Sequence, residues 1–493
     1  MELVYLWVEE YKNIDHQGFN FSPRFKCEYD EEKNELTINE NKEYVSIFPD
    51  NINITAIVGE NGSGKSSVFE GLFSFFGARV FVVFFENQFY IHKILSHEIK
   101  VINNTEKKYE IKKLGIYSGN ISPIIFSWDI LKYEPVLDFA SYSNRNPNIL
   151  LSVFGTFSHP EYMDLNSYQN NAVMKYIEVF MKYKTDIFDF SPNKVHIKFP
   201  MKKNENGWDC KKIRKEIEKL KFPEEEAKAK KKTYFRTISK FIEKYLHDGN
   251  YEKNFTLEEY NLLLNELEHM KEILSRFSSF ILDMYDDNIS FFGLSHGERS
   301  ILLSNALIYE SVMDAKKQDI LICLDEPDLS LHPEWQKKYI NELVKMFSQT
   351  TKNFHFLITS HSPFILSDLP KENVIFLEKG KQVYPFKDSE QTFGANIHTL
   401  LSHGFFMDEK GLMGEFAKEK IKNVISVLNE DEPNFDKKSE VQNIINIMGE
   451  PFLKHKLEEK FNEVFLTNDE KRTAKIEQLE KELKRLKNVN SEN

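Results

Sequence analysis

Short apolar runs along the chain predict buried β-strands. Three of them, at residues 52–58, 320–324 and 356–360, are rich in Ile, Leu, Val and Phe and carry few charges. Runs of this length without alternating polar positions are typical of strands covered on both faces, as in parallel sheets. A fourth segment, 373–384, contains two short apolar stretches around Lys379-Gly380-Lys381, which predicts an edge hairpin. The chain is therefore expected to form an α/β fold.

Helical signals follow a different pattern. Residues 66–73 predict a helix directly after the first apolar run. Thr256-Leu257-Glu258-Glu259 forms a capping box, which predicts a helix start. The apolar residues that follow recur at three and four positions: Tyr260, Leu263, Leu267, Met270, Leu274, Phe277 and Ile281. The highly charged stretch 211–236, with a break at Pro223, predicts an antiparallel helical arm, and residues 476–486 predict a short terminal helix.

The strongest chemical motif stands between the first strand and the first helix. It matches Gly, four residues, and Gly-Lys-Ser, and it consists of Gly59, Glu60, Asn61, Gly62, Ser63, Gly64, Lys65 and Ser66, followed by Ser67. Backbone N–H groups in such a loop, together with a helix N-terminus, bind phosphate. Lys65 is expected to reach the β/γ-phosphates and the Ser66 hydroxyl to ligate Mg²⁺. A chance glycine turn is the alternative, but the strand and helix on its flanks favour a nucleoside triphosphate site.

Three further motifs are weak when taken singly. Asp325-Glu326 ends a buried strand, where Asp325 is expected to hold Mg²⁺ and Glu326 to activate water. Ser295 and Gly297 lie in Leu294-Ser295-His296-Gly297-Glu298, a pattern that alone predicts only a helix cap. His361 follows the third apolar run, and a single histidine there is more often structural.

In order and spacing, these four motifs resemble the ATP-binding-cassette (ABC) ATPases: Walker A, signature, Walker B with its glutamate, and a switch histidine. The resemblance covers roughly residues 1–135 and 286–400. It implies a mixed α/β ABC-type P-loop ATPase head that binds ATP and Mg²⁺. It also implies that Ser295 and Gly297 act on the partner's nucleotide, so that two ATP are sandwiched in a head-to-tail dimer or a higher oligomer. His361 is then expected to sense the γ-phosphate.

Within that class, the Walker B region resembles the RecF, SMC and OLD branch rather than transport ATPases. Asp325-Glu326 is followed by Leu329-Ser330-Leu331-His332-Pro333. The opening strand leads to Lys12-Asn13, a corner that this branch places beside the nucleotide, although an exposed turn explains the two residues equally well. A RecF-like DNA repair ATPase remains an alternative function, and a transporter motor is disfavoured.

The segment 392–417 resembles the ATPase subunit of bacterial antiphage systems, notably PtuA of Septu and its retron-linked relatives. Asn396 and His398 lie in it, and packing is the more conservative role for both. Septu-type ATPases act with a separate HNH nuclease, and the clustered acids of an OLD-type nuclease are not found after residue 400. The resemblance thus implies an ATP-gated sensor or scaffold that controls an effector protein in trans and has no nuclease activity of its own.

The expected organisation has four parts: 1–135, the first half of the ATPase head; 136–285, a mainly helical insertion; 286–400, the second half of the head; and 401–493, a helical region for partner docking. In the insertion, five basic residues suggest a phosphate-contacting patch, but interleaved glutamates favour a solvated helix. The basic residues are Lys228, Lys230, Lys231, Lys232 and Arg236. Nucleic acid is thus a further candidate partner. The Q-loop residue is open between Gln88 and the Tyr142-Ser143-Asn144 region.

Composition adds limits to this picture. The 493 residues carry 65 Lys and Arg against 77 Asp and Glu, a formal net charge of −12. This balance argues against a protein whose whole surface binds nucleic acid. The three cysteines have neither disulfide nor zinc spacing, which suits a reducing compartment. We find no signal peptide and no membrane span, so a cytoplasmic location is expected.

Overall fold

The computed structural model divides the chain into two compact units, residues 1–406 and 407–493. The described residues are 2–42, 44–74, 78–93, 99–113, 121–129, 134–136, 165–183, 190–199, 203–204, 207–208, 210–220, 222–246, 252–277, 280–287, 289–315, 318–329, 331–387, 390–405, 413–430 and 434–467.

A seven-stranded sheet is the centre of the first unit, with the order β11-β10-β18-β19-β5-β20-β21. Its strands are β5 (Ile52–Gly59), β10 (Ile121–Asp129), β11 (Glu134–Val136), β18 (Asp319–Asp325), β19 (Asn353–Ser360), β20 (Val374–Glu378) and β21 (Lys381–Val383). The five central strands pair in parallel, and hairpins add an antiparallel strand at each edge. The three apolar runs became β5, β18 and β19, which are neighbours, and the predicted hairpin became β20 and β21.

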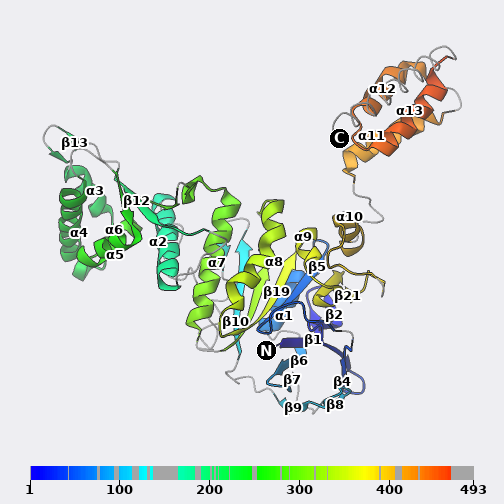
Figure 1. The fold of residues 1–493 in the computed structure, drawn as a ribbon, viewed down its shortest axis with the longest axis horizontal. Helices are drawn as coiled ribbons and strands as arrows, with labels where there is room; N and C mark the ends of the chain where they lie inside the picture. The colour runs from blue at the N-terminus through cyan, green and yellow to red at the C-terminus, as the bar shows by residue number, and fades with distance from the viewer. Residues whose placement is uncertain are drawn as a thin grey trace, which may run out of the picture. The chain divides into compact units, whose positions relative to one another are not determined.

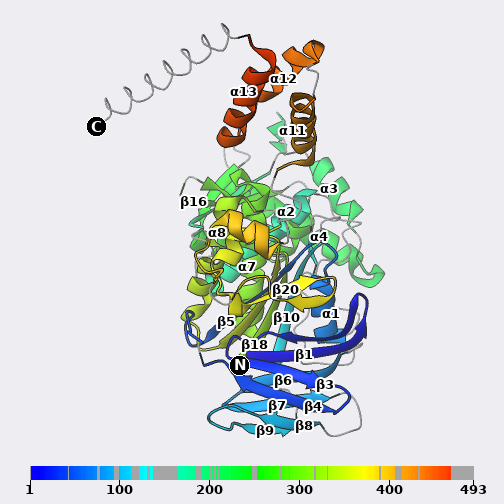
Figure 2. The ribbon, with the colours of Figure 1, turned by 90° about the vertical axis from the view of Figure 1, so that its right-hand side faces the viewer.

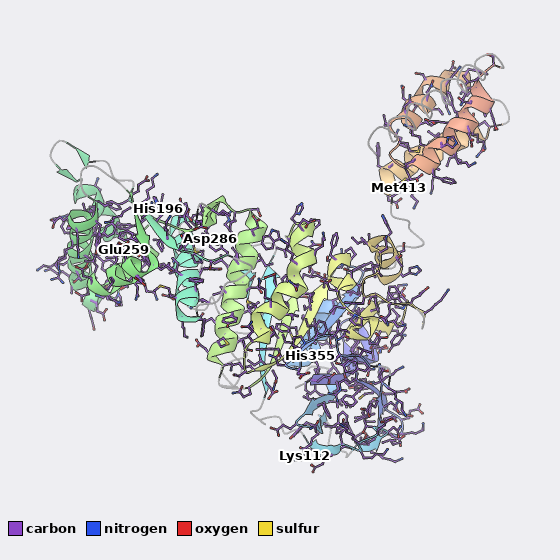
Figure 3. The ribbon with its side chains drawn as sticks, viewed as in Figure 1. Lys112, His196, Glu259, Asp286, His355 and Met413 are labelled. Carbon is purple, nitrogen blue, oxygen red and sulfur yellow. The ribbon has the colours of Figure 1, made fainter. Side chains whose placement is uncertain are left out.

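Two smaller sheets are stacked beside one face of this sheet (Figure 2). The first has five strands: β1 (Glu2–Tyr11), β2 (Ile14–Asn20), β6 (Ala78–Phe85), β7 (Gln88–Lys93) and β9 (Glu110–Lys113). The second has three: β3 (Phe25–Asp30), β4 (Glu35–Glu40) and β8 (Lys100–Asn103). Helix α1 (Lys65–Ser74) lies in the core between the seven- and five-stranded sheets, where Val68, Phe69 and Leu72 pack with Leu6 and Leu357. The phosphate loop is therefore held from two sides by buried apolar layers.

Helices cover the opposite face of the seven-stranded sheet (Figure 1). They are α7 (His296–Asp314), α8 (Pro333–Ser348) and α9 (Pro363–Ser367), and the short turns η3 (Phe291–Gly293) and η4 (Lys371–Asn373) precede α7 and β20. Phe347 of α8 stacks on Phe354 and Phe356 of β19, and Tyr309 of α7 stacks on Phe347. The large aromatic side chains thus fix the two helices to the strand that leads to His361.

The segment between the two halves of the head contains helices and an unpredicted sheet. Its helices are α2 (Leu165–Tyr183), α3 (Cys210–Lys219), α4 (Glu224–Tyr245), α5 (Leu257–Glu266) and α6 (Met270–Arg276). The sheet has the order β15 (Glu252–Thr256), β12 (Lys194–Lys198), β16 (Ile281–Asp286) and β17 (Ile289–Ser290), and β13 (Lys203–Asn204) pairs with β14 (Gly207–Trp208). The predicted charged arm is the pair α3 and α4, with Pro223 at the cap of α4.

One helix prediction in this segment was wrong. The capping box at Thr256 is present, but the helix it starts ends at Leu267 and does not continue to Ile281. His269 adopts a left-handed φ of 61° before α6, and Ile281 begins β16. The three-and-four spacing is present because each short helix buries its own apolar side chains, while the turn between the two helices has no strong sequence signal.

The end of the first unit contains α10 (Ile397–Thr399) and the π-helix η5 (Leu400–Gly404). The second unit is a bundle of α11 (Glu415–Leu428), α12 (Lys438–Asn446) and α13 (Pro451–Phe465), with the turn η6 (Phe435–Lys437) before α12. Its core is aliphatic and aromatic, including Val424, Ile445 and Phe461. The predicted terminal helix at 476–486 and the Q-loop candidate at 142–144 lie outside the described residues.

Candidate functional site

The glycine loop has a backbone that only glycine adopts easily. Gly62 and Gly64 have φ values of 75° and 107°, in the left-handed region that side chains disfavour. A Cβ on Gly59 would stand 2.3 Å from the Leu377 carbonyl oxygen of β20. The loop therefore bends tightly between β5 and α1, and α1 begins at Lys65 with its N–H groups turned toward the loop.

Two side chains of this loop are suited to phosphate. The Lys65 Nζ donates to the carbonyl oxygens of Gly59, at 3.3 Å, and Glu60, at 3.2 Å. Burial lowers the pKa of Lys65, although the charges of Glu326 and Asp325 oppose this shift. The Ser63 hydroxyl is buried and has no hydrogen-bond partner among the residues that the structure describes. A buried lysine and a buried hydroxyl at a helix start fit a bound polyphosphate.

The predicted magnesium ligands stand next to each other. Ser66 Oγ donates to Asp325 Oδ2 at 3.1 Å, and Thr359 Oγ1 donates to Asp325 Oδ1 at 2.5 Å. Burial raises the pKa of Asp325, and the two hydroxyl donors work against that shift. Hard oxygen atoms from a hydroxyl and a carboxylate, beside a phosphate loop, match the preference of Mg²⁺. These residues fit the ion, which Ser66 and Asp325 would hold.

The predicted catalytic pair is also together. His361 Nε2 lies 3.3 Å from Glu326 Oε1. His361, whose Nε2 faces this carboxylate, lowers the pKa of Glu326 and outweighs the effect of its partial burial. Glu326 has a left-handed φ of 47°, and its N–H donates to Thr359 Oγ1 at 2.8 Å. A strained residue held by its neighbours, with an ionised carboxylate, is suited to orient water and accept its proton.

The Lys12-Asn13 corner reaches the phosphate loop. Asn13 Nδ2 donates to the Gly62 carbonyl at 2.9 Å, while both Lys12 and Asn13 remain exposed. The turn of the β20–β21 hairpin meets the same place, because Gly380 N donates to Ser63 O at 2.9 Å. A Cβ on Gly380 would stand 1.9 Å from the Asn13 carbonyl oxygen. This contact of the hairpin with the phosphate loop was not predicted, although the Lys379-Gly380-Lys381 turn itself was.

Asp328 was also missed as part of the site. It is 5% exposed, and its Oδ2 accepts from Ser360 Oγ at 3.0 Å, while Oδ1 has no hydrogen-bond partner in the described part of the chain. Burial raises the pKa of Asp328 to about 6. It stands two residues after Glu326, and its partner Ser360 directly precedes His361. The Walker B loop is therefore attached to the segment that carries the histidine.

The signature residues form a local helix cap. Ser295 is the N-cap of α7, and Glu298 completes a capping box with it. Gly297 is buried in the first turn. Among the described residues, Ser295 forms side-chain hydrogen bonds with Glu298 of the same helix, through its own N–H and its Oγ. Within the loop, Asn61 is exposed and Ser67 is buried in α1, so neither is brought to Asp325 or Glu326 by a described contact.

Other candidates have structural surroundings. Gln88 donates to Glu110 within the five-stranded sheet. Asn396 caps α10 by accepting from His398 N at 2.8 Å, as a packing role requires. In the basic cluster, Lys231 pairs with Glu218 and Arg236 with Glu268. Lys230 also pairs with a glutamate, Glu226. These ion pairs favour the solvated-helix interpretation over a phosphate-binding patch.

Comparison with known proteins supports an ATPase relationship. Residues 170–367 match the family model described as "AAA domain, putative AbiEii toxin, Type IV TA system". The "Retron Vc95 probable ATPase" of Vibrio cholerae serotype O1 biovar El Tor is 23% identical over 409 residues, 71% of this chain and 74% of that protein. The "Retron Ec83 probable ATPase" of Escherichia coli is 28% identical over 154 residues, 29% of this chain but only 27% of that protein. The chain is thus distantly related to retron-associated probable ATPases.

Among solved structures, cbiO1 from Clostridium perfringens, part of an ABC transporter complex, aligns with 86% of this chain at 11% identity and a TM-score of 0.26. The SMC head domain from Thermotoga maritima aligns with 78% at 12% identity and a TM-score of 0.28. The parallel strands β18, β19 and β5, with the glycine loop after β5 and an acid pair after β18, define the fold class. It is the predicted mixed α/β fold of P-loop ATPases. In the described part of the chain, no helix has the length and apolar character to cross a membrane.

Proposed function

We propose that this chain is an ATP-hydrolysing subunit of a bacterial antiphage defence complex, in which it acts as a nucleotide-switched sensor or scaffold. The observation that carries the ATPase part is the grouping of Lys65, Ser66, Asp325, Glu326 and His361 at one edge of the parallel sheet. The defence part is supported by the distant similarity to the two retron-associated ATPases.

Each side chain has a defined role in this proposal. Lys65 and the loop N–H groups bind the β- and γ-phosphates of ATP, while Ser66 and Asp325 hold Mg²⁺. Mg²⁺ neutralises charge on the phosphates when bound. Glu326 orients water and accepts its proton, and its lowered pKa keeps it ionised at neutral pH. His361 holds the Glu326 carboxylate and senses the γ-phosphate.

The site is proposed to be completed by a second copy of the chain. Ser295 caps α7, so the first turn of that helix offers N–H groups of the kind that bind anions. Its described partners lie away from its own phosphate loop. We infer that the Ser295 end of α7 contacts the γ-phosphate bound by the partner, in a head-to-tail pair. ATP then holds the pair together and hydrolysis loosens it.

The effector is proposed to be a separate protein, such as an HNH nuclease, and the second unit is proposed as its docking region. Three large apolar side chains of that unit are strongly exposed: Phe416 at 76%, Ile447 at 83% and Phe452 at 71%. These exposed apolar side chains offer surface that a docking partner would cover, which supports the proposed role of the unit.

The test uses the purified chain with ATP and Mg²⁺, alone and with the proposed partner, a nuclease encoded beside the gene for this chain. The chain should hydrolyse ATP and leave plasmid DNA uncut in Mg²⁺ or Mn²⁺, and the pair should cut under ATP control. Lys65→Ala should abolish ATP binding and also phage protection by the intact gene cluster. Absence of ATP turnover would refute the ATPase role. Plasmid cleavage by Lys65→Ala alone would refute the assignment of cutting to a partner.

A further inference from the structure

The side chain of Trp335, at the start of α8, holds the signature motif. Its indole Nε1 donates to Glu298 Oε1 at 3.2 Å. The other oxygen, Glu298 Oε2, accepts from Ser295 N at 2.8 Å, and Ser295 Oγ accepts from Glu298 N at 3.3 Å. The position of Ser295 at the start of α7 therefore depends on Glu298. The position of the Glu298 carboxylate depends in turn on Trp335.

The next residue, Gln336, contacts the loop after Glu326 and the segment after His361. Its Nε2 donates to the carbonyl oxygens of Leu331, at 3.0 Å, and Asp328, at 3.4 Å, both in the loop that follows Glu326. Its Oε1 accepts from Ser362 Oγ at 2.7 Å, directly after His361. One amide side chain thus connects the Walker B loop with the switch segment.

The two side chains come from one rigid turn. Pro333 is the first residue of α8, and His332 caps the helix by accepting from Glu334 N at 3.3 Å. Behind that turn, Tyr339, Ile340 and Leu343 are buried against the sheet side of the molecule. Because Trp335 and Gln336 are consecutive in a capped and anchored helix, a displacement of one contact is transmitted to the other.

We propose that the first turn of α8 couples two ATP sites: the site in which the protomer binds its own ATP, and the site of the partner to which the protomer contributes Ser295. Gln336 moves with the Walker B loop and the switch segment of the protomer's own ATP site. Trp335 positions Ser295, the signature residue that contacts the ATP site of the partner. This proposal rests on the head-to-tail pair proposed above. Trp335 is a positioning residue, since it acts on Ser295 through Glu298.

A fluorescence experiment separates this coupling from pairing and from hydrolysis. In a Ser295→Arg background, which blocks the sandwich, addition of ATP and Mg²⁺ should change the tryptophan emission, because nucleotide at the protomer's own site moves the turn. The change should disappear in Ser295→Arg/Trp335→Phe and in Ser295→Arg/Gln336→Ala. Lys337→Gln, an exposed change in the same turn, should preserve it. Binding of mant-ATP, measured in parallel, should be equal in all four proteins.

The outcomes are distinguishable. If mant-ATP does not bind, the proposed ATPase function fails, and the coupling fails with it. If mant-ATP binds but the emission is unchanged, or if the change survives Gln336→Ala, the coupling alone is refuted. In the otherwise wild-type chain, Trp335→Phe should lower kcat about threefold to tenfold through the lost hydrogen bond to a carboxylate, with mant-ATP affinity unchanged. An equal loss of affinity and kcat would indicate a merely structural role.

Discussion

The phosphate edge of the first unit and the three-helix second unit are stabilised in different ways. At the phosphate edge, polar side chains bond in pairs across strands and loops: the half-buried Asp325 accepts from the buried Thr359, and the buried Asp328 accepts from the buried Ser360. In the second unit, the core consists of apolar side chains such as Val424, Leu457 and Phe461, and the ion pairs are at its surface. Large apolar side chains also remain exposed there.

This difference in stabilisation corresponds to a difference in the kind of role that each region suits. A buried polar network fixes charges in space and changes their pKa values, which is what a hydrolytic site needs. A bundle with an apolar core provides a shape and a surface, and under the proposed function its exposed phenylalanines would contact a partner. Substitutions in the first region should therefore alter turnover, and substitutions in the second should alter stability or association while turnover is kept.

The largest expected effect is on turnover. Glu326→Gln removes the proton acceptor, so kcat should fall by about 10²- to 10⁴-fold while ATP affinity changes little. Steady-state phosphate release and mant-ATP titration measure the two quantities. Glu334→Gln, the same change at an exposed position of α8, should retain wild-type turnover. Wild-type hydrolysis by Glu326→Gln would show that this carboxylate is not the general base.

A second change tests whether the first region needs a partner copy. Ser295→Arg places a bulky cation at the start of α7, so ATP-dependent association and hydrolysis should both be lost. Binding of ATP to a single protomer should persist, because Lys65 and Ser66 are untouched. Light scattering with and without ATP, done in the Glu326→Gln background, measures association. Full turnover by Ser295→Arg would contradict the shared site.

The apolar core of the second unit is tested by a matched pair of phenylalanines. Phe461 is 3% exposed and Phe452 is 71% exposed. Phe461→Ala should destabilise the unit by about 3–5 kcal/mol, because it removes a buried ring and leaves a cavity. Phe452→Ala should change stability by less than about 0.5 kcal/mol. Hydrogen exchange of α11 to α13 measures this. ATP turnover should be unchanged in both, and a drop in Phe461→Ala would show that the units depend on each other.

The smallest expected effect depends on pH and belongs to Asp328. Its folded-state pKa of about 6 lies above the ordinary 3.8, so the folded protein holds this proton more tightly than the unfolded chain. The contribution to stability is present below pH 3.8 and is lost as pH rises through about 6. Asp328→Asn cannot ionise and should be more stable than wild type at pH 8, by about 1–3 kcal/mol.

Urea unfolding at pH 8 and at pH 4 measures this difference, which should shrink toward the lower pH. The exposed Asp50→Asn is the control and should show no such trend. A stability difference that is independent of pH would mean that the Asp328 carboxyl titrates normally in the folded protein.

Motifs whose geometry is local were predictable from the sequence. The glycine loop needs left-handed backbone at Gly62 and Gly64, and the strand and helix around it follow from apolar runs and capping. Ser295 and Thr256 both cap helices as predicted. Asp325 and Glu326 meet Ser66 and His361 because β18, β19 and β5 are parallel neighbours, which the buried strand pattern already favoured.

Only the tertiary structure decided the contacts between segments far apart in the chain. The sheet of β12, β15 and β16 was missed because Lys194–Lys198 and Glu252–Thr256 have few apolar residues, and their pairing depends on partners many residues away. The contacts of Asn13 with Gly62, Gly380 with Ser63 and Trp335 with Glu298 are of the same kind. Local pattern encodes which elements form, whereas side-chain contacts across elements depend on how those elements pack.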